Sequence, residues 1–78
     1  MTLDPEGPVP LYQQLADLLR KQIESGTLAP NRPIPSENTL QQEYGVSRDT
    51  ARHAIALLRE AGLVVTVRGK GTYVASRD

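Results

Sequence analysis

The sequence predicts an α+β domain that is mainly α, with three helices followed by a small antiparallel β-hairpin. Two observations support this prediction. Apolar residues recur every three or four positions through much of the chain, and a β-branched, alternating segment lies near its end. A chain of 78 residues makes one domain with a small core. We expect this domain to occupy residues 10–75, between a flexible lead-in at 1–9 and the start of a linker, or a chain end, at 76–78.

The first helix is predicted to start at Pro10 and to stop near Ser25 and Gly26, because glycine readily takes the left-handed conformation that ends helices. The next nine residues, "TLAPNRPIP", contain three prolines and predict a loop with at most one short edge strand around Ile34. The apolar face of the first helix consists of Leu11, Leu15, Leu18, Leu19 and Ile23.

Two further helices are predicted with a tight turn between them. Ser36 and Ser47 each stand where a side-chain oxygen can cap the start of a helix. The second helix ends at about Tyr44, where Gly45 turns the chain, and the third runs from Ser47 to a stop at Gly62. One side of the third helix is apolar and contains Ala51, Ala54, Ile55, Leu58 and Ala61. The other side contains Arg52, Ala56 and Arg59.

The remaining segment, "LVVTVRGKGTYVA", predicts a β-hairpin with "RGKG" as its turn. In such a hairpin Leu63, Val65 and Val67 share one face, and Val64 and Thr66 share the other.

The formal net charge is zero, but the charge is polarised along the chain. Residues 1–43 carry three basic and six acidic side chains, a net −3, whereas residues 44–78 carry six basic and three acidic, a net +3. Zero net charge alone argues against a nucleic-acid partner, because affinity for nucleic acid depends on neutralising phosphates. The basic second half of the chain argues in the opposite direction.

Composition excludes several kinds of site. Without cysteine and with a single histidine, we expect no disulfide, no metal site and no cofactor. "RGKGT" lacks the upstream glycine and the hydroxyl after lysine that a phosphate-binding loop requires, and no acid–base pair indicates an enzyme. No apolar run approaches the roughly 20 residues of a membrane span, and the start lacks a signal-peptide pattern. We therefore expect a cytoplasmic chain without a membrane partner.

Two helices joined by a glycine turn, the second capped by serine and basic in its first turns, form a helix-turn-helix. In this arrangement the start of the second helix enters the DNA major groove. Arg52 is the first candidate for a base contact, because the guanidinium meets O6 and N7 of guanine together. The candidate DNA-contacting residues of this helix are Ser47, Arg48, Asp49, Thr50, Arg52 and His53.

A basic hairpin directly after a helix-turn-helix makes a winged helix. The glycines of its turn allow the backbone to approach DNA closely, so this turn can lie along or in the minor groove. Its candidate residues are Arg68, Gly69, Lys70 and Gly71.

From Pro10 to Val74 the chain resembles the N-terminal DNA-binding domain of GntR-type (gluconate-repressor-like) bacterial transcription regulators. The resemblance lies in three blocks, "PLYQQLADLLRKQIESGTL", "PSENTLQQEYGVSRDTARHAIALLREAGLV" and "RGKGTYV", in this order. It implies a repressor that binds inverted-repeat operators as a homodimer, through basic residues of both helices and of the hairpin turn. The residues carried over by this resemblance are Arg48, Thr50, Arg52, Arg68, Gly69 and Lys70.

The chain departs from the family pattern at Asn38, where members usually have arginine after "PSE". Asparagine is shorter and uncharged, so the usual arginine contact is not carried over to it, but its amide can still reach a phosphate or an adenine edge. Asp49 is a second departure: it either accepts from a cytosine amino group or stabilises the positive helix end. Ser36 and Asn38 complete the candidate set. The resemblance also places effector binding and dimerisation in a later domain, so we expect this chain to be monomeric and to have no effector site.

A second hypothesis is a winged helix that serves as a protein-interaction module. In this hypothesis the basic residues of the third helix dock on an acidic partner protein. The positions of the basic residues, at the start of the third helix and at the hairpin turn, favour DNA instead. A protein-binding wing would expose apolar residues at these points.

Overall fold

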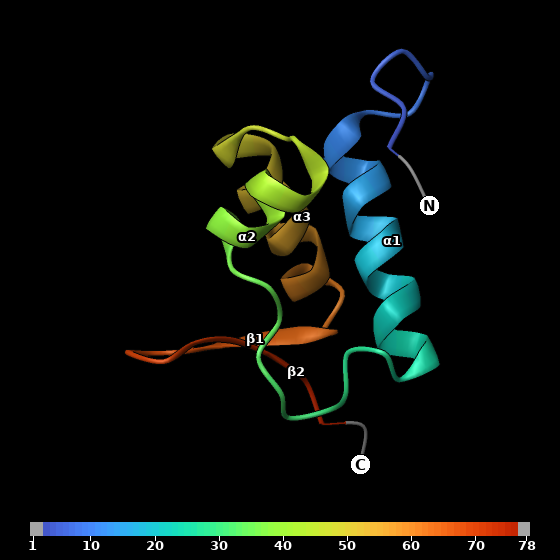
Figure 1. The fold of residues 1–78 in the computed structure, drawn as a ribbon. Coiled ribbons are helices and arrows are strands. Elements are labelled where there is room, and N and C mark those ends of the chain that lie inside the picture. Colours follow the sequence, from blue (N-terminus) through green and yellow to red (C-terminus); the bar gives the residue numbers. More distant parts are fainter. Residues whose placement is uncertain (1–2, 77–78) are drawn as a thin grey trace.

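The computed structural model describes residues 3–76, so the ends of the expected lead-in and linker (1–2 and 77–78) lie outside the described residues. Within this range three helices precede a two-stranded antiparallel sheet, which confirms the predicted α+β architecture (Figure 1). The helices are α1 (Leu11–Ser25), α2 (Glu37–Tyr44) and α3 (Arg48–Glu60), and the strands are β1 (Val64–Val67) and β2 (Gly71–Val74).

The predicted end of α1 is confirmed. Gly26 adopts the left-handed conformation with φ 87°, and its N–H donates to the Ile23 carbonyl oxygen. The longest helix of residues 3–76 is α1, with 15 residues, and none of the helices there has the length and apolarity that a membrane span requires.

The irregular segment before α1 is fastened to the helix by one side chain. Gln14 Nε2 donates to the carbonyl oxygens of Asp4 and Val9, each at 2.7 Å, and Gln14 Oε1 accepts from the Asp4 N–H at 2.7 Å. Residues 3–9 therefore lie against the first turns of α1 although they form no regular element.

The core lies mainly between α1 and α3, which make the most extensive contact of any two helices. Four of the five predicted apolar residues of α1 are buried, and Leu11 is half-buried. The prediction for α3 holds except at Ala61, which is exposed because the helix ends at Glu60 and Ala61 is its C-cap. The buried residues of these helices are Leu15, Ala16, Leu18, Leu19 and Ile23 in α1, and Ala51, Ala54, Ile55 and Leu58 in α3.

The hairpin closes the core with one residue from each strand. Val64 and Val74 are directly paired in the antiparallel register, and each is only 1% exposed. Val65 and Val67 point to the opposite face and are 47% and 37% exposed. This alternation follows from the two-residue repeat of a β-strand.

The proline-rich loop covers the outer edge of β2. Pro33 forms an isolated antiparallel bridge with Tyr73, and the Ile34 N–H donates to the Thr72 carbonyl oxygen at 3.0 Å. The Asn31 N–H likewise donates to the Val74 carbonyl oxygen at 2.9 Å. The expected edge strand near Ile34 is therefore present as an isolated bridge, and it brings the start of α2 close to the hairpin.

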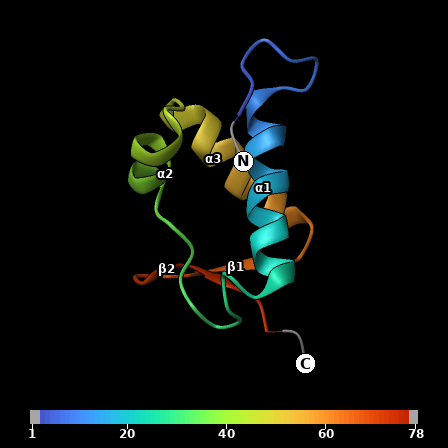
Figure 2. The same ribbon diagram turned by 45° about the vertical axis from the view of Figure 1, so that its right-hand side comes forward.

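Figures 1 and 2 show that α2 and the tip of the hairpin project toward the same side of the molecule, while α1 covers the opposite side of α3. On this side, residues of α3 line a groove between the start of α2 and the hairpin tip.

Replacement of Val64 by alanine should lower the free energy of unfolding by about 1.5–3 kcal/mol, because it removes two buried methyl groups and leaves a cavity. The matched variant Val65→Ala in the same strand should change it by no more than about 0.5 kcal/mol, since Val65 is largely exposed. Urea unfolding followed by circular dichroism measures both. Equal losses in the two variants would contradict the observed burial of the hairpin.

Candidate nucleic-acid interface

The turn between α2 and α3 is built from three consecutive residues. Gly45 has φ 65° and donates its N–H to the Gln41 carbonyl oxygen, which ends α2. Val46 is buried in the core, and Ser47 then takes an extended conformation and caps α3. Because Val46 is anchored in the core, the angle between the two helices is set by packing as well as by the glycine.

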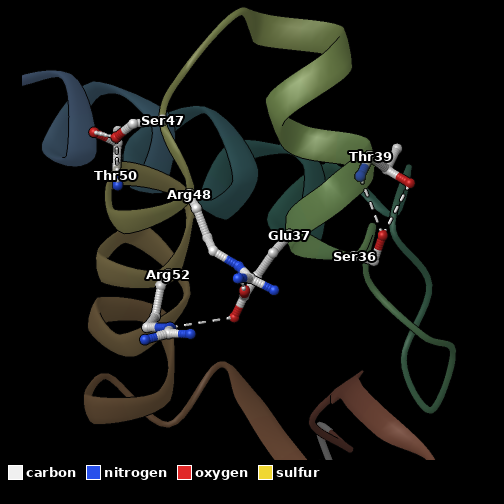
Figure 3. A network of polar contacts seen from close by, with 7 residues as sticks. All are labelled: Ser36, Glu37, Thr39, Ser47, Arg48, Thr50 and Arg52. Carbon is white, nitrogen blue, oxygen red and sulfur yellow. Dashed lines mark hydrogen bonds and ion pairs between the residues drawn. The ribbon is translucent and has the colours of Figure 1, made fainter.

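Both predicted serine caps are confirmed. Ser36 Oγ accepts from the Thr39 N–H and Ser47 Oγ accepts from the Thr50 N–H, each at 3.1 Å (Figure 3). The Ser47 hydroxyl also donates to Thr50 Oγ1 at 2.9 Å. Ser47 and Thr50 therefore stabilise the start of α3, and Thr50 can present its methyl group while its hydroxyl is bonded locally.

An acidic residue of α2 holds two arginines of α3. Glu37 Oε1 lies 3.7 Å from Arg48 Nε, and Glu37 Oε2 lies 3.7 Å from Arg52 Nε (Figure 3). This contact was not predicted from the sequence. No signal in the sequence indicates it, since the pairing depends on the angle at which α2 crosses α3.

A groove of about 560 Å³ lies between the start of α2, the face of α3 and the hairpin tip. It collects residues from three separate segments, and its basic side chains outnumber its acidic one. The polar and charged lining comprises Ser36, Glu37, Asn38, Arg52, Arg59, Lys70 and Thr72. Of the predicted DNA-contacting residues, the groove thus brings together Ser36, Asn38, Arg52, Lys70 and Gly71.

The other candidates lie outside this lining. Ser47, Arg48 and Asp49 are exposed at the start of α3, and Thr50 is half-buried beside them. Arg68 and Gly69 are exposed in the turn between β1 and β2.

His53 is turned toward α1 by an aromatic contact. Its ring stacks on Tyr12 with the centroids 3.7 Å apart and the planes 4° from parallel. This contact places His53 at the junction of α1 and α3, away from the groove that contains its neighbour Arg52.

Among residues 3–76 no three His, Cys, Asp or Glu side chains gather closely enough to hold a metal ion. The charged side chains that line the groove are mainly basic, and they come from two helices and the hairpin.

Comparison with known proteins identifies the family. The family model described as "Bacterial regulatory proteins, gntR family" matches residues 11–74. The chain belongs to the gntR family. This membership confirms the resemblance found in the sequence, and it indicates a regulatory rather than an enzymatic protein.

Individual gntR relatives agree with this result. The chain is 37% identical over 75 residues to the HTH-type transcriptional repressor NagR of Bacillus subtilis, covering 96% of this chain and 31% of NagR. It is 47% identical over 68 residues to the mannosyl-D-glycerate transport/metabolism system repressor MngR of Escherichia coli, covering 87% of this chain and 28% of MngR. The chain thus spans less than a third of the length of these two repressors.

A solved DNA-binding domain has the same fold. The DNA-binding domain of AraR, in complex with operator ORE1, superimposes with a TM-score of 0.83 at 42% identity, covering 94% of this chain and 89% of that one. The predicted winged helix-turn-helix is therefore confirmed.

Loss of the Ser47 cap should destabilise the start of α3. Ser47→Ala is expected to lower the free energy of unfolding by about 1 kcal/mol, because the Thr50 N–H loses its acceptor. Ser47→Asn supplies another capping oxygen and should keep most of this stability. Thermal unfolding of the two variants tests the cap, and a Ser47→Ala variant as stable as the wild-type domain would show that the hydrogen bond contributes nothing.

Proposed function

We propose that this chain is the operator-binding domain of a bacterial transcriptional repressor. In this proposal α3 enters the major groove of double-stranded DNA and the hairpin tip lies at the minor groove. The observation that supports it most is the groove that collects Arg52, Arg59 and Lys70 beside α3. AraR, a structural neighbour with the same fold, is bound to operator DNA.

Arg52 is proposed to contact bases. It lies near the start of α3, its side chain is 63% exposed, and it lines the groove. A guanidinium in the major groove pairs with O6 and N7 of guanine through two parallel hydrogen bonds. Arg48, one turn earlier, is proposed to reach a neighbouring base or phosphate. Asp49 beside it is proposed either to accept from a cytosine amino group or to stabilise the positive end of α3.

Phosphate contacts are proposed for residues at the hairpin tip and at the starts of α2 and α3. Lys70 and Arg68 at the hairpin tip supply positive charge, and Gly69 and Gly71 allow the backbone to approach the minor groove. Ser36 and Asn38 at the start of α2, and Ser47 and Thr50 at the start of α3, suit phosphate oxygens or base edges. His53 remains a candidate for the phosphate side, next to its stacking partner Tyr12.

We assign residues 10–75 to the DNA-binding unit and propose that the full-length regulator binds an inverted repeat as a homodimer in the cytoplasm, at the nucleoid. A single domain contacts one half-site, so it should bind weakly as a monomer. No effector site is proposed within this chain.

One observation favours a second candidate, the protein-interaction module. Val65 and Val67 are exposed on one face of the hairpin, and exposed apolar residues are typical of protein interfaces. These valines lie in β1, however, and not at the hairpin tip, where Arg68 and Lys70 stand. The tip is thus suited to a polyanion rather than to an apolar partner surface.

A duplex selected from a random pool tests the proposal directly. In an NMR titration of the labelled domain at two salt concentrations, we expect salt-sensitive shifts at Asn38, in residues 47–53 and in residues 68–71. DNA binding through phosphates weakens as salt rises, because counterions are released on binding. If no duplex shifts any resonance even at low salt, the protein-interaction module becomes the better hypothesis.

Replacement of Arg52 and of Lys70 by alanine should have different consequences. Arg52→Ala is expected to weaken binding to the selected duplex by about 1–3 kcal/mol and to reduce discrimination against other sequences. Lys70→Ala should weaken binding to all sequences about equally and reduce the salt slope by about 1.

Fluorescence anisotropy with selected and scrambled duplexes measures both effects. Lys21→Ala is the charge-matched control, since Lys21 is exposed on α1 and does not line the groove. Equal losses from Arg52→Ala and Lys70→Ala on every duplex would rule out the separation of base and phosphate contacts.

A further inference from the structure

The carboxylate of Glu37 contacts two arginines at once. One of its oxygens faces Arg48 Nε and the other faces Arg52 Nε, both at 3.7 Å. The Glu37 side chain is 35% exposed, compared with 71% and 63% for its two partners. The carboxylate is therefore the inner group, and the two arginine side chains extend beyond it toward solvent.

The contact acts on a specific edge of each guanidinium. Arginine can form paired hydrogen bonds either through Nε and one Nη, or through its two terminal Nη groups. The closest approach of Glu37 is to Nε in both residues and, at 3.7 Å, is an ion pair without a hydrogen bond, so the terminal Nη groups of Arg48 and Arg52 keep their donors for an outside partner. This geometry favours an end-on approach of each guanidinium to the bases.

We infer that Glu37 is a positioning residue that determines the sequence specificity of the α3 arginines. The inference depends on the proposed function and deepens it. Ion pairs between side chains as exposed as these contribute little to folding, so stability does not explain the arrangement. The arrangement is explained by orientation of the two arginine side chains, because a restrained guanidinium loses less conformational freedom when it binds a base.

Glu37 also disfavours the wrong complex. On a sequence without suitably placed guanines, Arg48 and Arg52 would turn to phosphates and leave the carboxylate unpaired close to a polyanion. The repulsion between carboxylate and phosphate raises the free energy of that complex more than that of the specific one. Glu37 therefore weakens non-specific binding in particular.

A purely structural role for Glu37 has different consequences. As the first residue of α2 it interacts favourably with the positive end of that helix. If this were its only role, its replacement would lower stability without altering the ratio of specific to non-specific affinity.

The first variant is Glu37→Gln, which keeps the size of the side chain and removes its charge. Dissociation constants are measured for a selected duplex and for a scrambled duplex of the same length and composition, at two salt concentrations. We expect tighter binding of the scrambled duplex and a roughly tenfold fall in the ratio of specific to non-specific affinity, within the range that one bidentate arginine contact supplies. The Nε–H NMR signals of Arg48 and Arg52 should shift in the free variant, because the negative charge beside each Nε has been removed.

Glu43→Gln is the matched control. It removes the same charge from the same helix, and Glu43 is exposed and has no ion pair within residues 3–76. It should strengthen binding to both duplexes by the same factor and leave the affinity ratio unchanged.

Glu37→Asp serves as a second variant should Glu37→Gln fail to fold. It keeps the negative charge at the helix start but is too short to face both Nε atoms, so its affinity ratio should fall while its stability is retained. An unchanged ratio in a folded Glu37 variant would overturn the inference. A wild-type domain that does not prefer the selected duplex would instead overturn the proposed function itself.

Discussion

The packing of α3 against α1 is the interaction on which the rest of the structure depends. Ala51 and Ala54 are completely buried, and such small side chains allow the two helices to approach closely. Because the apolar residues of α3 recur with the helical period, burial of one face forces the other outward. Arg52 and Arg59 are therefore exposed as a direct consequence of core formation.

The proline-rich loop does more than connect α1 to α2, because it also pairs with the hairpin. Its bridge to Tyr73 and the hydrogen bond from Ile34 occupy the free edge of β2, which would otherwise be open to pairing with another chain. The same contacts hold the start of α2 beside the hairpin, and so Ser36 and Lys70 line one groove although they are distant in sequence. The loop thus both protects the hairpin and assembles the candidate interface.

Most element boundaries could be predicted because their signals are local. Gly26 and Gly45 end helices, and Ser36 and Ser47 begin them, through contacts within a few residues of the chain. The prediction was wrong only at the margins, as at Ala61, where the helix ends before the apolar pattern does. The zero net charge was uninformative, since what matters for a polyanion is where the positive charges lie.

The sequence by itself determined the helices, the hairpin, the family and the set of basic residues available to a partner. Only the tertiary structure decided how these residues are used: Glu37 holds Arg48 and Arg52, whereas His53 stacks on Tyr12 of another helix. The physical reason is the sequence separation over which each interaction acts. Caps and turns depend on neighbouring residues, but ion pairs and stacked rings between helices depend on crossing angles that are set by the packing of the whole core.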